Sequence, residues 1–339
     1  MKRILIWMAV VVIAAVVFVG VHHGWQTYPR LWQMVAGPRA RRLRDLAFER
    51  TPARRARGEY LVNGVLACSR CHSERDWSQP GGPPVPGKEF AGHISSEDGR
   101  PWLVAPNLTS DPETGAARWS DDMLARAIRE GVGHDGRALH PQMWYAAFSQ
   151  LSDEDVASVV VFLRGLPPIR NRLPQTKLTW EERFEVNSRP EPIGGPVDGD
   201  LSQPVKLGEH LEYVADCAGC HTDWYHPGSE VNGRLFGGGN ELWAPNGKIY
   251  SSNITPDPSG ISYYDEALFL RVLRTGKVGA RPLSGVMPWY WYKNLSDGDL
   301  KVLFAWLRAQ EPVKHTVDNT EPPTFCKRCR QWHGGGDRN

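Results

Sequence analysis

Residues 68–72 read CSRCH and residues 217–221 read CAGCH, two copies of the pentapeptide C-x-x-C-H. The chain has only six Cys and eleven His among its 339 residues, so a second copy is not expected by chance. In this motif two thiols form thioether bonds to one haem, and the adjacent imidazole becomes the proximal ligand of the iron. The sequence therefore predicts two covalently bound haem c groups. The residues that would hold them are, in chain order, Cys68, Cys71, His72, Cys217, Cys220 and His221.

Two Cys at this spacing also occur in zinc sites and in redox-active dithiols. A zinc site needs a second pair of ligands about 12 to 20 residues away, and neither motif has one at that distance. A dithiol of the thioredoxin type does not need the His that follows the second Cys. Both alternatives therefore explain the motif less well than haem attachment does.

A third pair, Cys326 and Cys329 in CKRCR, lacks the His. In an oxidising compartment a local disulfide is the simplest interpretation. Metal binding together with His333, or pairing with a partner subunit, are the alternatives.

The chain contains one module twice. GEYLVNGVLACSRCH at 58–72 corresponds to GEHLEYVADCAGCH at 208–221, and NLTSDPETG from residue 107 corresponds to NITPDPSG from residue 253. QMWYAAFSQLSDEDV from residue 142 corresponds to VMPWYWYKNLSDGDL from residue 286. The offset falls only from 149 residues at the first Cys to 144 at the Met, so the order is kept and loop lengths differ.

The repeat also indicates the distal ligand of each iron. A Met opposite a proximal His raises the reduction potential of a haem carrier. Of the six Met, only Met143 and Met287 occupy equivalent positions, each eight residues before a Leu-Ser-Asp sequence. We expect these two Met, together with the two His of the motifs, to ligate the irons. His140 is the alternative in the first module, where its counterpart in the second module is Ser284.

Both modules are expected to be helical. Ser152 with Asp155, and Ser296 with Asp299, have the spacing of a capping box, and apolar residues follow each pair at helical intervals. A middle helix is expected from about 120 to 130, with its equivalent near 265–274. Seven Pro lie between 167 and 204, which indicates an ordered strap or linker between the modules.

An apolar run, residues 4–21, follows Lys2 and Arg3. Its length of about 18 residues, or about 27 Å as a helix, is near the minimum for crossing a bilayer. A cleaved secretory signal is the alternative, although its apolar part is usually shorter and ends at a small-x-small site. Arginines that follow the run disagree with the positive-inside rule, but large domains cross a membrane largely regardless of charge. We expect an anchor in the bacterial cytoplasmic membrane with the haem modules on the periplasmic side.

The predicted organisation is a transmembrane helix at 1–25, a basic linker at 26–52, cytochrome domains at 53–170 and 205–313, a Pro-rich linker at 171–204 and a tail at 314–339. The arginines of the basic linker have two interpretations, contact with anionic headgroups or an acidic partner, or simple solvation. Forty Lys and Arg nearly balance 38 Asp and Glu. The overall charge therefore gives no reason to expect nucleic acid as a partner.

The motifs resemble those of a known family. G-E-x-L before C-x-x-C-H, N-[LI]-T-x-D-P and M-x(7)-L-S-D are similar to sequences of the membrane-associated multihaem cytochrome c subunits of bacterial alcohol, gluconate and related dehydrogenases. The resemblance covers both modules. It implies a class I cytochrome c fold around each haem. The expected protein is therefore all-α, with two tandem class I cytochrome c domains after the N-terminal transmembrane helix that the apolar run predicts. The resemblance also implies that the subunit takes electrons from a catalytic partner and delivers them to ubiquinone or a terminal oxidase.

We therefore expect a dihaem c-type cytochrome that relays single electrons between a redox partner, such as a dehydrogenase, and the respiratory chain. Such a subunit would not be catalytic by itself. A dihaem peroxidase-like enzyme would need one open iron, which a Met in both modules disfavours. A cytochrome subunit of an oxidase or of a quinol-oxidising complex is the other alternative, and a quinone is a candidate partner in either complex.

Overall fold

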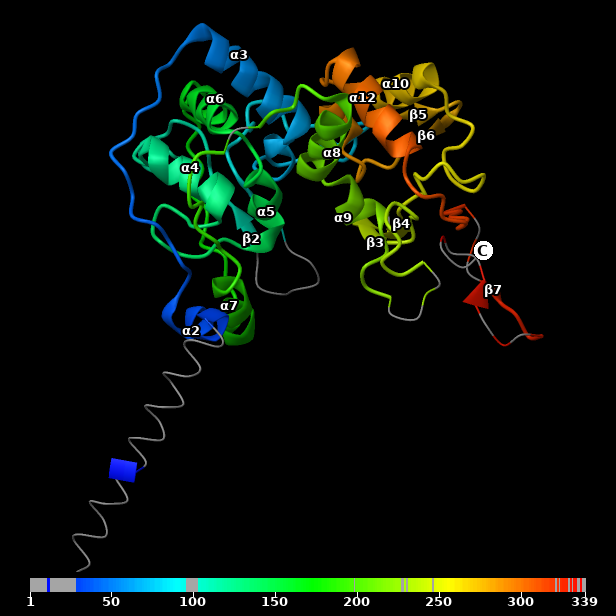
Figure 1. Ribbon diagram of the computed structural model, residues 1–339, viewed down its shortest axis with the longest axis horizontal. Helices are drawn as coiled ribbons and strands as arrows, with labels where there is room; N and C mark the ends of the chain where they lie inside the picture. The colour runs from blue at the N-terminus through cyan, green and yellow to red at the C-terminus, as the bar shows by residue number, and fades with distance from the viewer. Residues whose placement is uncertain are drawn as a thin grey trace, which may run out of the picture.

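A computed structural model of the chain describes residues 11–12, 29–95, 103–197, 199–226, 229, 231–245, 247–320, 322, 324–328, 330, 332–333 and 336. This part is mostly helical with little sheet, as expected (Figure 1). Apart from residues 11 and 12, the predicted membrane helix at 1–25 lies outside the described residues. Within the described ranges, no helix is long and apolar enough to cross a membrane.

The first module is built from short helices around the first C-x-x-C-H. In chain order its elements are α3 (Pro52–Tyr60), a π-helical turn η1 (Leu61–Val65), a 3₁₀ turn η2 (Cys68–Arg70), β1 (His93–Ser95), β2 (Leu103–Ala105), α4 (Asp121–Glu130), a 3₁₀ turn η3 (Pro141–Met143), α5 (Tyr145–Phe148) and α6 (Asp153–Arg164).

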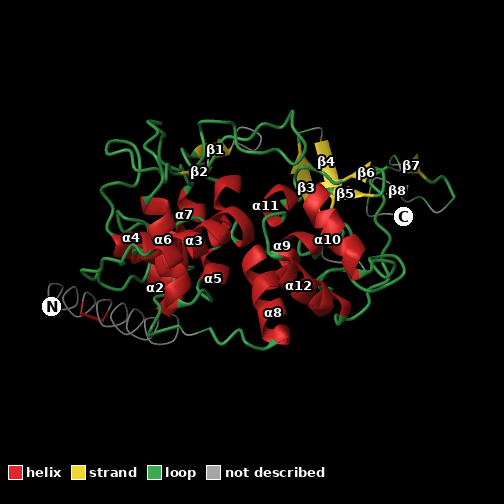
Figure 2. Ribbon diagram, turned by 90° about the horizontal axis from the view of Figure 1, so that it is seen from above, coloured by secondary structure: helices red, strands yellow, loops and turns green. Residues whose placement is uncertain are grey.

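The second module repeats this order. Its elements are α8 (Pro204–Ala215), α9 (Cys217–His221), β3 (Glu241–Ala244), β4 (Gly247–Tyr250), α10 (Glu266–Thr275), β5 (Lys277–Val278), β6 (Arg281–Pro282), α11 (Trp289–Tyr292) and α12 (Asp297–Arg308), and β7 (Thr324–Phe325) with β8 (Trp332–His333) follows. The strands form antiparallel two-stranded hairpins, which lie along one side of the helices (Figure 2). The all-α prediction did not include these hairpins.

The last helix of each module packs along the helix that leads into C-x-x-C-H, α6 on α3 and α12 on α8. Two glycines allow this close approach. A Cβ at Gly58 would lie 2.0 Å from the carbonyl oxygen of Ser158, and one at Gly208 would lie 2.6 Å from the Cβ of Trp306. These are the glycines of the two G-E-x-L sequences, so that motif serves helix packing.

The linker between the modules contains a helix that was not predicted, α7 (Trp180–Asn187). Its start is a capping box in which Thr179 accepts a hydrogen bond from the N–H of Glu182 and the Glu182 carboxylate accepts one from the N–H of Thr179. Another helix, α2 (Pro29–Ala36), packs against α7, and the two lie side by side in Figure 1.

Residues 38–50 form a strap that is fixed to α4. The guanidinium of Arg41 donates two hydrogen bonds to Asp122, both 2.7 Å, and one of 2.7 Å to Glu130. The N–H groups of Arg44 and Phe48 donate to the carboxylates at the start of α4. Arg41 is therefore used inside the protein, so neither of the two interpretations of the basic linker holds for this residue.

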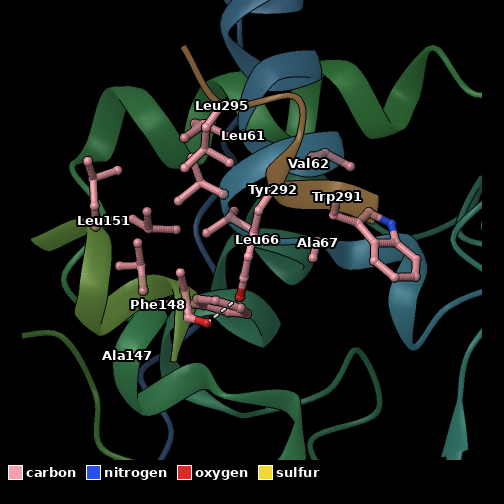
Figure 3. Close-up of a cluster of buried hydrophobic side chains, with 14 of the residues drawn as sticks. Leu61, Val62, Leu66, Ala67, Ala147, Phe148, Leu151, Trp291, Tyr292 and Leu295 are labelled. Carbon is pink, nitrogen blue, oxygen red and sulfur yellow. Dashed lines mark hydrogen bonds between the residues drawn. The ribbon is translucent and has the colours of Figure 1, made fainter. Parts of the chain in front are cut away.

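Apolar side chains of the two modules form one continuous cluster. The turn η1 contacts α11, and α5 contacts α8, so each module presents its post-methionine helix to the other module. Figure 3 shows residues of both modules interleaved in this shared core, among them Leu61, Leu66, Phe148, Trp291, Tyr292 and Leu295. The modules are thus packed together as one body.

Candidate functional site

A left-handed residue precedes the first Cys of each motif. Ala67 has φ 47° and Asp216 has φ 58°, a conformation that is uncommon for residues other than Gly. Asp216 is the C-cap of α8, and Ala67 follows the C-cap of η1, so in both modules the chain turns directly before the C-x-x-C-H segment. The two motifs then form short helical turns, η2 and α9.

Both motif histidines are oriented by a backbone carbonyl. The Nδ1 atom of His72 lies 2.8 Å from the carbonyl oxygen of Pro106, and Nδ1 of His221 lies 2.7 Å from that of Ser252. Because a carbonyl can only accept, the neutral ring carries its proton on Nδ1 and leaves the lone pair on Nε2. Burial lowers the pKa of both imidazoles, although these hydrogen bonds raise it. Each neutral ring thus has the lone pair of Nε2 available to bind a metal ion.

A repeated Asn-x-Thr sequence directly follows each of these carbonyls and is itself hydrogen-bonded into its module. Asn107 Oδ1 accepts hydrogen bonds from the N–H and the hydroxyl of Thr109, and its Nδ2 donates to the carbonyl oxygen of Ile169 at 2.8 Å. In the second module Asn253 makes the same pair of bonds to Thr255, and its Nδ2 donates to the carbonyl oxygen of Val313 at 2.6 Å. The repetition of Asn-x-Thr was visible in the sequence, but its role was not.

The two candidate distal ligands occupy equivalent places. Met143 ends η3 directly before the left-handed residue Trp144 and α5, and Met287 lies two residues before α11. Both are partly buried and packed against the shared core. His140, the alternative ligand, caps η3, and its Nδ1 accepts a hydrogen bond of 3.3 Å from the N–H of Gln142.

Polar atoms beside the methionines fit a bound haem. The indole N–H of Trp144, the hydroxyl of Tyr145 and the indole N–H of Trp289 are buried and have no hydrogen-bond partner among the residues that the structure describes. Tyr145 and Trp289 are equivalent in the repeat, and each ring lies over the left-handed glycine that ends α4 or α10. A buried donor normally has a partner. Haem carries two carboxylates, so a donor repeated in both modules fits such a group.

The motif cysteines do not resemble a thiolate metal site. Burial raises the pKa of Cys68 to about 12, and it raises the pKa of Cys217 well above the ordinary value. Metal-binding and redox-active cysteines instead have a lowered pKa. Cys68 and Cys217 thus lack the lowered pKa that is typical of metal-binding thiolates. In the third pair, Cys326 is partly buried and Cys329 lies outside the described residues, so its role stays a prediction.

No family model matches the chain. Among curated proteins it is similar to the fructose dehydrogenase cytochrome subunit of Gluconobacter japonicus, with 33% identity over 78% of this chain and 55% of the relative. It is also similar to the cytochrome c subunit of the alcohol dehydrogenase (quinone) of Gluconobacter oxydans, with 26% identity over 76% of this chain and 55% of the relative.

A third relative, named diheme cytochrome c-type, comes from Cereibacter sphaeroides, with 28% identity over 63% of this chain and 72% of the relative. The chain thus spans about half the length of the two dehydrogenase subunits and most of the dihaem protein. The relatives agree with the resemblance found in the motifs.

Proposed function

This chain is a homologue of the cytochrome c subunits of bacterial alcohol, fructose and gluconate dehydrogenases, and from that relationship we propose that it is a dihaem c-type cytochrome. Its function is to relay single electrons between a dehydrogenase-like redox partner and the respiratory chain. A haem iron held between His and Met takes up or releases one electron without opening a site for substrate.

The observation that carries the proposal is the duplicated environment of the motif histidine. In both modules Nδ1 is bound to a carbonyl next to an Asn-x-Thr sequence, while Nε2 is left with its lone pair. A hydrogen bond of this kind fixes the tautomer and the ring orientation of a ligand. Because the tautomer and orientation of the His ring are fixed in the same way in both modules, two equivalent electron-carrier sites are favoured over one carrier site and one catalytic site.

The roles of the residues follow from this arrangement. His72 and His221 are the proximal ligands, and Met143 and Met287 are the distal ligands. The thioether attachments are Cys68, Cys71, Cys217 and Cys220. The partner is a dehydrogenase of the kind named among the relatives, and a quinone is a candidate acceptor, since one relative carries that word in its name. We place the modules on the periplasmic side of the cytoplasmic membrane, on the basis of the N-terminal apolar run.

An optical spectrum of the detergent-purified protein tests the proposal. We expect two c-type haems per chain, both low-spin in the oxidised and reduced forms and both indifferent to carbon monoxide. Met143→Ala and Met287→Ala should each convert one haem to a form that binds carbon monoxide, while Met123→Ala should leave both unchanged. A wild-type protein with one carbon monoxide-binding haem would contradict the carrier function and favour an enzyme.

A further inference from the structure

The first haem motif is hydrogen-bonded to the second module. The indole Nε1 of Trp291 donates to the hydroxyl of Ser69 at 2.7 Å, across 222 residues of sequence. Ser69 is the residue after the first Cys of CSRCH. Only 4% of Ser69 and 1% of Trp291 are exposed to solvent. A buried bond of this kind is costly to lose, because it would leave a polar group without a partner.

Arg70, the next residue of the motif, extends the contact to the second motif. Its guanidinium lies near Cys220 and Asp216 and interacts electrostatically with both. Both of these residues belong to the turn that carries the second C-x-x-C-H. The two motifs therefore meet at the interface between the modules.

A second arginine braces the same interface. The guanidinium of Arg75 donates to the carbonyl oxygen of Gly82 in the first module and to that of Gly285 in the second, at 2.8 and 2.7 Å. The Cζ atom of the Arg75 guanidinium lies 4.9 Å from the centre of a ring of Trp291. The indole of Trp291 is thus held from two sides.

The helix α11 contacts the first motif and also the end of the helix that leads into the second motif. Trp291 contacts Ser69 in the first motif, and the neighbouring Tyr292 donates from its hydroxyl to the carbonyl oxygen of Ala215 at 2.5 Å. Ala215 lies two residues before Cys217. The helix starts two residues after Met287, so one rigid element connects the surroundings of both haems.

The repeat shows that this contact is not needed by the module itself. The residue equivalent to Trp291 in the first module is Ala147, and the residues equivalent to Ser69 and Arg70 in the second are Ala218 and Gly219. At each of these positions, therefore, one of the two modules has a small residue and still forms its motif turn. The larger and polar side chains occur only in the copy where they reach across the interface.

We propose that Trp291 is a positioning residue that holds the first haem motif against the second through Ser69, so that the two haems exchange electrons directly within the chain. The inference rests on the proposed function, since it needs two haems. One electron leaves the reduced iron of one module and arrives at the oxidised iron of the other, and no proton or covalent bond changes. An electron that enters at one haem can then leave the chain from the other haem.

The exchange of haem-methyl NMR signals in the half-reduced, detergent-purified full chain measures this electron transfer. Trp291→Phe keeps an aromatic ring but removes the donor, and Ser69→Ala removes the acceptor. We expect each variant to slow the exchange about tenfold, because small displacements of a reacting pair have effects of this order. The double variant should be no slower than the single ones, since the two residues act through one bond.

Ser69→Thr retains the hydroxyl and should exchange at the wild-type rate. The matched control is Trp180→Phe, because 74% of that residue is exposed and it lies in the linker. Unchanged exchange in both Trp291→Phe and Ser69→Ala, with two low-spin haems present, overturns the positioning role and leaves the proposed function intact. A wild-type chain with fewer than two low-spin haems overturns both.

Discussion

The imidazole of His72 is bound to the carbonyl of Pro106, and the residue after Pro106 is the Asn of the first Asn-x-Thr sequence. The same relationship joins His221 to Ser252 and the second such sequence. Two motifs that are about 35 residues apart in sequence therefore form one unit in space. The Asn side chain does not contact the imidazole. Its hydrogen bonds restrain the backbone next to the carbonyl group that does.

Asn107→Ala should raise the reduction potential of the first haem. Without the Asn network the Pro106 carbonyl is no longer held, the His72 imidazole becomes a weaker electron donor, and the oxidised iron loses stabilisation. Buried partners are left unpaired, so the protein should also lose about 1–3 kcal/mol of stability. Spectroelectrochemical titration measures the potentials, and Asn253→Ala is the matched variant, since it should shift only the second haem. Equal shifts of both haems by one variant would contradict a local effect.

Arg41→Ala should destabilise the first module by about 3–5 kcal/mol, because it leaves buried carboxylates without their cation. The side chains of Asp122 and Glu130 are only 1% and 3% exposed. Arg39→Ala is the control, since the ion pair of Arg39 with Glu191 is exposed and should contribute about 0–1 kcal/mol. Chemical denaturation and proteolysis of the strap report the two effects, and similar losses in both variants would refute the role of Arg41.

The same ion pair predicts how stability depends on pH. Burial raises the pKa of Asp122, whereas hydrogen bonds from Arg41 and from the N–H of Arg44 lower it. Their combined effect is larger than that of burial, so the pKa of Asp122 in the folded protein lies below the ordinary value. The stabilisation is therefore complete above the ordinary pKa of an Asp and is lost as pH falls through the folded value. The difference in stability between wild type and Arg41→Ala should be largest near neutral pH and should shrink on acidification.

Gly131→Ala should destabilise the first module more than Gly136→Ala. Both glycines have positive φ, 68° and 82°, so an alanine costs about 1–2 kcal/mol at either position. At Gly131 the new Cβ would also lie 2.6 Å from the ring of Tyr145, whereas at Gly136 nothing lies within 4 Å. Thermal unfolding of the two variants isolates the contact with the ring, and equal melting temperatures would show that this ring can move away.

Local patterns in the sequence predicted the helices well. The middle helices match α4 and α10, and Ser152 and Ser296 cap α6 and α12 as expected. Only half of each predicted capping box forms, because the carboxylate of Asp155 accepts from Arg57 and that of Asp299 accepts from the hydroxyl of Tyr60. The Thr179-x-x-Glu182 signal of α7 was present in the sequence, but the prolines around it favoured an ordered strap or linker without a helix.

The residue roles that could not be predicted from the sequence depend on partners far away in the chain. The role of Asn107 needs the carbonyl of Ile169, 62 residues away, and the role of Ser69 needs Trp291 in the other module. Neither pairing leaves a periodic pattern. One signal was available, however, because the two copies differ at the positions of Ser69 and Trp291. These side chains form the contact between the modules, which does not contribute to the packing inside either module.

The shared core also determines the order in which this protein can be completed. A ribosome finishes the first module before Trp291, Tyr292 and Leu295 have been made, although these residues cover its apolar face in the folded chain. Until they arrive, that face is open to water and to other nascent chains. The first module can therefore bury this face only after the last helices of the second module have been synthesised.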